Sequence, residues 1–408
     1  MNVLFIHEVD WLKKVVFDIH TLAESLSLRG HRVYAIDYEN TWKKSGFFDL
    51  GTLKTREVEG VSRAFDGSSV SLVRPGFIKI VGLSRISAAF THYREIRRVI
   101  REKKIDAVVL YSAATNGLQT LSIARRLNVP VVFRSIDILN QLVVYPYLRP
   151  LTRALEKAVY ARADMILTLT PGLTEYVVKL GAERQRVKLL PMPVDTAIFH
   201  PAPPPEELYR KWGIAKDDDV ILFIGTLFDF SGLDLVIRRF PEVIAGAPRA
   251  RLLIVGDGPQ RRKLEGVIAE MGLADKIAIT GFQPYNTMPQ YINMARVCLN
   301  SFEITGATRD IFPGKIVQYL ACARAVVATP LPGLVAVTPG EEQGMVFYRT
   351  PEEMAARLIK VLGDAEYRQR LERNGRDYVV RAHSCESIAA QLESRLKEAI
   401  AARGAGPA

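Results

Sequence analysis

A length of 408 residues is more than one ordinary hydrophobic core organises, so it favours two domains. With 48% hydrophobic and 24% charged residues the composition is that of a globular protein, and no run reaches the ~18 apolar residues of a membrane-spanning helix. The formal net charge of +11 is strongly basic, and three scattered cysteines favour neither a disulfide framework nor a zinc site.

In the first half of the chain, apolar runs alternate with segments of helical period. Helices are expected at residues 19–29, 118–127 and 152–161, and strands at residues 3–6, 33–36, 107–111, 129–133, 165–168 and 187–190. Strands that are joined through helices pair in parallel, so residues 1–198 are predicted to form one doubly wound α/β domain.

Basic residues are concentrated in the same half. Residues 1–195 hold 29 Lys and Arg against 19 Asp and Glu, whereas residues 201–408 hold 26 against 25. The density is highest in residues 72–104, where nine basic residues are interleaved with apolar ones such as Phe77 and Phe90. A basic segment with apolar anchors can lie on an anionic membrane surface, so peripheral contact with such a membrane is predicted here.

A second interpretation of this basic segment stays open. Residues 94–104 can form an ordinary solvated helix whose apolar side chains face the core. Nucleic acid is not expected as a partner, because no recognised nucleic-acid-binding motif occurs. The opening residues, MNVLFIHE, begin a strand and lack the basic region of a signal peptide, so we expect a cytoplasmic protein that can contact the inner face of the cell membrane.

The second half repeats the alternation after four prolines in residues 199–208 (FHPAPPPEEL), which predict a linker before a domain over residues 209–380. Helices are expected at residues 233–244, 260–271 and 288–294, and strands at residues 220–224, 251–255, 277–280, 297–300, 325–328 and 345–347. A long amphipathic helix over residues 385–402 lies in the C-terminal region, residues 381–408, which is predicted to pack back on the first domain.

The stretch RDIFPGKIVQYLACARAVVATPLPG, residues 309–333, predicts a ligand site. A polar loop runs into Pro313, and proline suits the first turn of a helix because its missing N–H would have no partner there. The amides of Gly314, Lys315 and Ile316 should therefore point out of the end of the helix that follows.

Charge and spacing make this helix start a candidate phosphate site. The helix end carries roughly half a positive charge, and Lys315 adds a full one beside it. Gln318 lies three residues on and shares the face of Lys315. Asp310, in the preceding loop, can either contact the ligand or cap the helix. The local pattern thus favours a phosphorylated ligand.

Other polar residues carry weaker signals. His7 follows the first strand, at the carboxyl end where open sheets bind ligands, and is a candidate for an acceptor side. Gly225 can be an ordinary turn glycine, and residues 256–259 lack the third glycine of a dinucleotide fingerprint. Residues 217–219 have Asp-x-Asp spacing but stand on a polar turn before a strand, which favours a solvated turn, so no metal is expected.

Blocks of sequence along nearly the whole chain resemble the GT-B glycosyltransferases of family 4, which are retaining and use nucleotide sugars. In the first half these blocks are LAESLSLRGHRVYAID (22–37), VPVVFRSID (129–137) and the run from ARADMILTLT (161–170) to LLPMPVDTAIFHP (189–201). In the second half they are ILFIGTLFDFSGLDLVIRRF (221–240), RLLIVGDGPQRRKLE (251–265), ITGFQPYNTMPQYINMARVCLNSFE (279–303) and PGKIVQYLACARAVVATPLPG (313–333). The resemblance implies two Rossmann-like doubly wound parallel-sheet domains, facing each other across a cleft.

Several functional positions of the family are changed in this chain. The two acids of its Glu-x7-Glu pair fall at Asp310 and Gln318, and its first-loop Arg and Lys fall at Thr226 and Ser231. Lys315 is then the best remaining cation for a diphosphate.

The acceptor half departs in the same way. The Gly-Gly pair that follows the first strand in the family becomes Lys13-Lys14, and of its His-Asp pair only Asp137 is kept.

The residues and the resemblance together imply a set of site residues. Lys315, Asp310 and Asp137 are expected to be catalytic, with His7, Lys13 and Lys14 on the acceptor side. Donor-binding residues are expected to be Gly225, Thr226, Gly256, Phe282, Pro313, Gly314, Lys315, Ile316 and Gln318. No metal and no cofactor is expected, because the nucleotide sugar is a co-substrate.

The implied reaction is transfer of a sugar from a nucleotide-sugar donor to a lipid-linked acceptor or to a polysaccharide or other glycoconjugate. A lipid-linked acceptor is favoured by the basic excess of the first half and by the apolar residues of segment 138–151. The leaving phosphate is expected to deprotonate the acceptor, with Glu303 or Asp137 as alternative groups. Two other functions stay open: a non-catalytic GT-B subunit that positions a partner enzyme, and a nucleotide-sugar epimerase.

Overall fold

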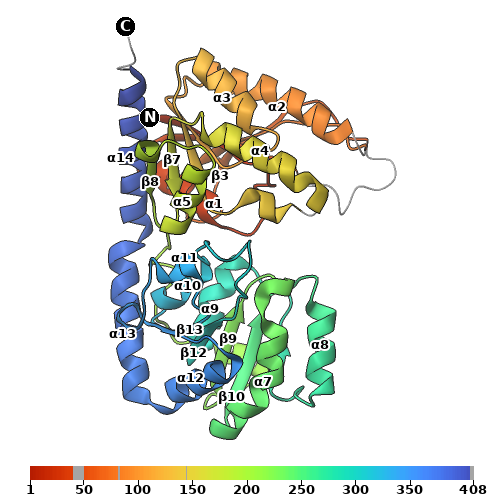
Figure 1. The fold of residues 1–408 in the computed structure, drawn as a ribbon, viewed down its shortest axis with the longest axis vertical. Coiled ribbons are helices and arrows are strands. Elements are labelled where there is room, and N and C mark those ends of the chain that lie inside the picture. Colours follow the sequence, from red (N-terminus) through yellow and green to blue (C-terminus); the bar gives the residue numbers. More distant parts are fainter. Residues whose placement is uncertain (40–49, 81–82, 144, 405–408) are drawn as a thin grey trace. The chain divides into compact units, whose positions relative to one another are not determined.

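A computed structural model describes residues 1–39, 50–80, 83–143 and 145–404 of the chain. The chain divides into two compact units, of which the first comprises Met1–Pro191 together with the C-terminal stretch from Cys385, and the second comprises Met192–Ser384. Figure 1 shows each unit as a sheet covered by helices. Both units are α/β, and each has a largely or wholly parallel sheet, as predicted.

The first unit is built on an eight-stranded sheet. Its neighbouring strands are parallel except for one antiparallel pair at an edge, β3 with β4. In spatial order the strands are β3 (Arg56–Val61), β4 (Val70–Arg74), β2 (Arg32–Ile36), β1 (Asn2–Ile6), β5 (Ala107–Leu110), β6 (Val131–Ser135), β7 (Met165–Thr168) and β8 (Val187–Leu189).

Helices cover both faces of this sheet because successive residues of its central strands point to opposite sides. Leu4 and Ile6 pack in the core of one face, whereas Val3 and Phe5 pack in the core of the other. Leu392 of the last helix belongs to the second of these cores, so the C-terminal helix completes the first unit. The helices of this unit are α1 (Asp18–Leu28), α2 (Leu83–Glu102), α3 (Gly117–Arg126), α4 (Arg149–Tyr160), α5 (Pro171–Lys179) and α14 (Cys385–Gly404).

The second unit has a six-stranded sheet in which every neighbouring pair is parallel. The strand order is β11 (Ile277–Ile279), β10 (Ala250–Val255), β9 (Asp219–Ile224), β12 (Val297–Asn300), β13 (Ala325–Ala328) and β14 (Met345–Phe347). Its helices are α6 (Glu206–Lys211), α7 (Leu233–Gly246), α8 (Arg261–Glu270), α9 (Met288–Met294), α10 (Lys315–Ala321), α11 (Pro332–Val335), α12 (Pro351–Gly363) and α13 (Ala365–Ala382).

The proline-rich segment is not where the two units divide. The division falls between Pro191 and Met192, so residues 199–208 belong to the second unit. Phe199 is fully buried, and its carbonyl accepts a hydrogen bond from Arg376 of α13 at 2.9 Å. These contacts hold the prolines against the second unit, although their composition is typical of a linker.

Each sheet has one point at which the strand order reverses. The reversal lies between β1 and β5 in the first unit and between β9 and β12 in the second. Ligands of open parallel sheets bind outside the carboxyl ends of the strands at this switch point. The residues that follow β1, β9 and β12 are therefore the places where a site is expected.

Candidate functional site

Two glycines bring the loops after β9 and β10 into contact. Gly225 and Gly256 have φ values of 150° and 149°, which favour glycine. A Cβ atom on Gly256 would stand 1.9 Å from the carbonyl oxygen of Gly225, so no other residue fits there without a shift of the backbone. The Gly225 N–H donates to the carbonyl oxygen of Val255 at 3.0 Å and continues the pairing of the two strands.

The loop after Gly225 is fixed against the segment that follows β12. Gly232 has a φ of 67°, and a Cβ there would meet the carbonyl oxygen of Ser301 at 2.1 Å. The Ser301 hydroxyl donates to the carbonyl of Ser231 at 2.7 Å, and the Glu303 N–H donates to that of Phe230 at 2.9 Å. Thr226 stays exposed on this fixed loop, so its hydroxyl is available to a ligand.

Helix α10 is tied to the end of β9. Its Tyr319 hydroxyl accepts a hydrogen bond from the Ile224 N–H at 2.7 Å. The Ile316 N–H donates to the carbonyl of Pro313 at 3.0 Å, so the prediction that this amide points out free is wrong. The Ile316 N–H is not free because the chain makes a tight turn at Pro313, and this turn brings the Pro313 carbonyl within reach of that N–H.

The side chain of Lys315 turns toward Gly225. Its ammonium nitrogen is enclosed and has no hydrogen-bond partner among the described residues. It lies 3.7 Å from the ring centroid of Phe223 and 4.0 Å from that of Phe302. It is also 3.6 Å from the point that a Cβ on Gly225 would occupy. Burial lowers the pKa of Lys315 well below its ordinary value, because the charged form loses its hydration.

The remaining predicted donor residues lie around the same end of the second sheet. Gln318 follows Lys315 on α10 and is partly exposed. Asp310 lies in the loop before α10, and the residue at the start of the helix, Gly314, has no side chain to cap it. The loop of Asp310 is held in place because the Gly333 N–H donates to the carbonyl of Arg309 at 2.9 Å.

Phe282 lies at the same end of the second sheet, after a different strand. It follows β11 and is 66% exposed. Its neighbour Gly281 pairs with Gly256 in an isolated bridge, which places Phe282 close to the glycine contact described above. An exposed aromatic ring at this position can stack on a planar ligand group.

In the first unit, His7 lies at the carboxyl end of β1 between two aromatic rings. The ring centroids of Phe17 and Tyr111 are 5.7 Å and 5.5 Å from that of His7. Its Nδ1 atom has no hydrogen-bond partner among the described residues. Burial lowers the pKa of His7 to about 3, so the imidazole is neutral at pH 7.

Asp137 follows β6 and has the opposite shift. Burial, with a smaller contribution from Asp18, raises the pKa of Asp137 to about 6, while Lys14 lowers it. Lys14 also contributes to the lowered pKa of His7. The structure therefore brings His7, Lys14 and Asp137 together at one end of the first sheet.

A buried ion pair stands behind these residues. Arg134 and Asp18 are both almost fully buried, and their nearest nitrogen and oxygen are 2.8 Å apart. The Tyr111 hydroxyl donates to Asp18 at 2.6 Å, and Arg134 donates to the carbonyl of Leu190 at 2.7 Å. This pair was not predicted, although an arginine inside the apolar run VVFRS was a signal for a buried partner.

Side-chain hydrogen bonds close the loop that carries Lys13 and Lys14. The Asp10 carboxylate accepts the N–H groups of Leu12 and Lys13, each at 3.1 Å, and Asp37 accepts that of Trp11 at 2.9 Å. These bonds close a tight turn directly after β1.

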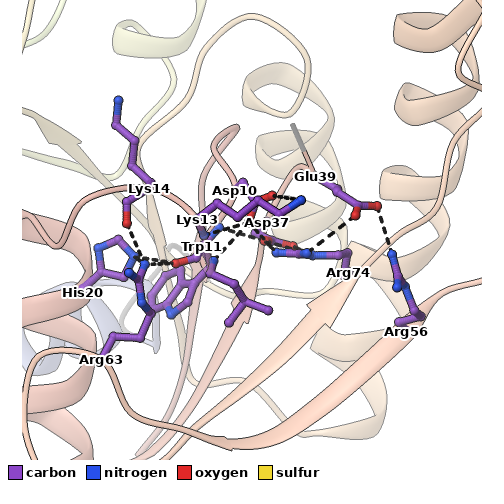
Figure 2. A network of polar contacts seen from close by, with 11 residues as sticks. Asp10, Trp11, Lys13, Lys14, His20, Asp37, Glu39, Arg56, Arg63 and Arg74 are labelled. Carbon is purple, nitrogen blue, oxygen red and sulfur yellow. Dashed lines mark hydrogen bonds and ion pairs between the residues drawn. The ribbon is translucent and has the colours of Figure 1, made fainter. Parts of the chain in front are cut away.

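Arg74 locks this turn to the end of β4, as Figure 2 shows. Its guanidinium reaches Asp10 at 2.8 Å and also binds Asp37. Lys13 lies 3.9 Å from Asp10, whereas the side chain of Lys14 extends away from the network. Of the two predicted lysines, Lys14 is thus the better placed to meet an acceptor.

Comparisons with known proteins agree with this architecture. Residues 17–193 match the family described as a glycosyl transferase 4-like domain, and residues 218–364 match glycosyl transferases group 1. A D-inositol 3-phosphate glycosyltransferase from Acidothermus cellulolyticus is 30% identical over 240 residues, which cover 56% of this chain and 52% of that protein. The chain spans about half the length of the curated relatives it matches.

Solved structures share the fold over nearly the whole chain. Sucrose-phosphate synthase from Thermosynechococcus elongatus has a TM-score of 0.74 at 17% identity, covering 98% of this chain and 99% of that one. HepE from Anabaena, in complex with UDP, has a TM-score of 0.71 at 14% identity, covering 98% and 100%. The architecture is therefore GT-B.

The two matched regions fill most of this architecture, one in each unit. The chain belongs to the GT-B glycosyltransferases of the family 4 type.

The described residues contain neither a cluster suited to a metal ion nor a helix suited to span a membrane. No three His, Cys, Asp or Glu side chains gather there as a metal ion would need. In the same part of the chain, no helix is both long enough and apolar enough to cross a membrane.

Proposed function

We propose that this chain moves a sugar from a nucleotide-sugar donor to an acceptor, with retention of the anomeric configuration. The observation that carries the proposal is the Lys315 ammonium, which lies beside Gly225 at the carboxyl end of β9 and has no hydrogen-bond partner among the described residues. A buried cation without a counter-ion favours an anionic ligand, and the switch point of an open sheet is where ligands bind. The UDP complex of HepE, which has the same fold, supports a nucleoside diphosphate as that ligand.

The chemistry asks for positive charge near the leaving group. As the bond between the sugar and the diphosphate breaks, the sugar becomes oxocarbenium-like and negative charge builds on the leaving oxygen. In our proposal Lys315 receives this charge together with the Gly314 amide, and no step calls for a metal. Thr226 and Gln318, at the positions of charged residues in the family, hydrogen-bond the donor.

The acceptor hydroxyl group loses a proton when it attacks the sugar, so a base must accept that proton. In a retaining reaction the donor phosphate leaves from the face that the acceptor attacks, so a phosphate oxygen can take this proton. Asp137 is the alternative base, because its raised pKa of about 6 makes it a better proton acceptor than an ordinary carboxylate. Asp310 is assigned to the donor sugar, where its carboxylate can accept hydrogen bonds from hydroxyl groups.

A lipid-linked acceptor is supported by the exposed apolar residues of the first unit. On α2, Ile86 and Phe90 are 68% and 69% exposed, and the exposed Arg94 and Arg97 continue the same stripe. Such a stripe can insert apolar side chains into a bilayer while its arginines contact anionic headgroups. We therefore propose peripheral membrane contact through α2.

The predicted membrane segment needs correction at both ends. Its first part forms β4, and Phe77, expected as an anchor, is buried. Its last part is amphipathic with Ile96 and Val99 in the core, as the alternative interpretation predicted. Residues 81 and 82 of the segment lie outside the described residues.

A second apolar patch supports the same acceptor. Tyr145, Tyr147 and Leu151 are exposed within segment 138–151, of which residue 144 lies outside the described residues. A contiguous patch of this kind often marks a lipid or protein interface.

Release of nucleoside diphosphate from UDP-, GDP- and ADP-sugars, with lipid extract as acceptor, tests the reaction. Lys315→Ala is expected to lower turnover by roughly a hundredfold or more, the effect of losing one charge-stabilising group. Lys263→Ala, at an exposed lysine on α8, should leave the rate unchanged. A near-normal rate for Lys315→Ala would remove the assignment. No turnover with any donor would favour a non-catalytic subunit.

A further inference from the structure

The ammonium group of Lys315 lies against the faces of two aromatic rings. Phe223, near the end of β9, and Phe302, just after β12, lie within van der Waals contact of its nitrogen, at centroid distances of 3.7 Å and 4.0 Å. No described oxygen accepts a hydrogen bond from this nitrogen. A buried lysine usually donates to a carboxylate or a carbonyl oxygen. The two ring contacts that replace such a partner here call for an explanation.

Aromatic rings hold a cation differently from a carboxylate. The face of a phenyl ring carries partial negative charge, which attracts the ammonium group at short range. Unlike a carboxylate, the ring bears no net charge and therefore does not neutralise the cation. The charge of an ammonium group held in this way therefore stays available to an incoming anion, which in turn offsets the lowering of the lysine pKa by burial.

The two rings also fix the direction of the lysine side chain. Phe223 is fully buried in the core of the second unit, so its ring cannot move without disturbing the sheet. Phe302 packs edge-on against Phe230 at a centroid distance of 5.4 Å and an interplanar angle of 83°. Phe230 in turn stacks on Phe228 at 5.1 Å.

These contacts connect Lys315 to the loop that follows β9. Phe228 and Phe230 both belong to that loop, and Phe228 is 42% exposed. Thr226 and Ser231 of this loop stand at the positions that the family resemblance assigns to an arginine and a lysine. Aromatic residues of the loop therefore support a cation that comes from α10 instead.

We propose that Phe223 and Phe302 are positioning residues that hold Lys315 by their ring faces for the diphosphate of the donor. The inference rests on the proposed function, since it takes the anion to be a nucleoside diphosphate. It predicts that affinity for the anion depends on the electron density of these rings as well as on their size.

Fluorinated phenylalanines at residue 302 separate these two properties. Fluorine withdraws electrons from the ring face and changes its shape little, so it weakens a cation–π contact in steps. Replacing Phe302 by 4-fluoro- and then 3,4,5-trifluorophenylalanine should raise the dissociation constant of the bound nucleoside diphosphate progressively, by roughly three- to tenfold for the trifluoro form. Phe302→Leu should weaken binding at least as much.

Phe240 provides the matched control. It is fully buried in the same core but makes no ring contact with Lys315 among the described residues, so trifluorophenylalanine there should leave nucleotide affinity unchanged. Equal weakening at residues 240 and 302 would show a general loss of stability and overturn the inference.

Lys315→Ala and the unmodified protein separate a failure of the ring contact from a failure of the proposed function. If this variant loses binding while fluorination of Phe302 has no effect, the ring contact is not a positioning device and only the inference fails. If the unmodified protein binds none of UDP, GDP and ADP, the proposed function fails and the inference fails with it.

Discussion

Lys315 and Asp137 both stand in surroundings that disfavour their charged forms. Burial lowers the pKa of Lys315 and raises that of Asp137 to about 6. Groups shifted in this direction cost folding free energy at neutral pH, because the folded state holds them less favourably than water does. Such a cost is common where a residue serves a ligand or a reaction.

Asp137→Asn should make the protein more stable at neutral pH and less active. The carboxyl pKa is raised from 3.8 to about 6 on folding, so its favourable contribution to stability is complete below about pH 4 and is lost as the pH rises through about 6. The melting temperature of the unmodified protein should therefore fall over this interval relative to that of the variant. If Asp137 acts as the base, turnover should fall as the pH drops below about 6, and the variant should lack this dependence.

Thermal unfolding at pH 4, 6 and 8 measures the stability part of this prediction. Asp217→Asn, at a carboxylate exposed on a surface turn, serves as the control. It should change neither the pH dependence of the melting temperature nor that of turnover. Identical pH profiles for the unmodified protein and Asp137→Asn would contradict the assignment.

Some site residues could be predicted from local sequence, and others could not. Lys315 follows a Pro-Gly pair, which marks a helix start, so its place at the end of a helix could be predicted from neighbouring residues alone. Its ring partners Phe223 and Phe302 are far away in the sequence and look like ordinary core residues. Only the parallel pairing of β9 with β12 brings them together.

Elements with a strong apolar pattern were predicted to within a few residues, as for β7, β12 and α9. Strand β3 was missed because its REVEGV sequence is polar and almost wholly exposed at the sheet edge. The division between the units does not coincide with residues 199–208, because proline content reports local stiffness and says nothing of the tertiary contacts that bury Phe199.

At the scale of elements, the contact of the loops after β9 and β10 should be sensitive to one methyl group. Gly256→Ala would force a Cβ to within 1.9 Å of the Gly225 carbonyl oxygen, so we expect a loss of roughly 3 kcal/mol or more of unfolding free energy. Nucleotide affinity should fall as well, because Gly225 faces Lys315. Chemical denaturation and nucleotide titration measure the two effects.

Gly30→Ala is the control for this substitution. Gly30 also has a positive φ, of 83°, but a Cβ there would meet open space. This variant should lose only about 1–2 kcal/mol and bind nucleotide normally. Equal losses for the two variants would mean that backbone strain, and not the loop contact, determines the effect.

Helix α2 provides a second test at this scale. The double variant Ile86→Ser/Phe90→Ser should reduce binding to phosphatidylcholine vesicles that contain phosphatidylglycerol by roughly tenfold or more, since both exposed side chains would leave the bilayer. Leu235→Ser, at an exposed leucine of α7, should have no effect. Sedimentation with vesicles measures binding, and equal binding to vesicles of phosphatidylcholine alone would contradict the proposed electrostatic part.

At the scale of the molecule, each unit places its candidate residues beyond the carboxyl ends of the strands of its own sheet. His7 and Asp137 follow strands of the first unit, whereas Gly225 and Lys315 lie at the reversal in the second. This division matches the two regions that belong to the glycosyltransferase family. The chain then returns to the first unit, where α14 contributes Ile388, Leu392 and Leu396 to the core.

The central claim is that the Lys315 ammonium binds the diphosphate of a nucleotide-sugar donor. Thermal stabilisation by UDP, GDP and ADP, compared between the unmodified protein and Lys315→Ala, tests it most directly. At a hundred times its dissociation constant, a ligand should stabilise the fold by about 2.7 kcal/mol. We expect one nucleotide to raise the melting temperature of the unmodified protein and not that of Lys315→Ala. Equal stabilisation of both proteins, or of neither, would contradict the claim.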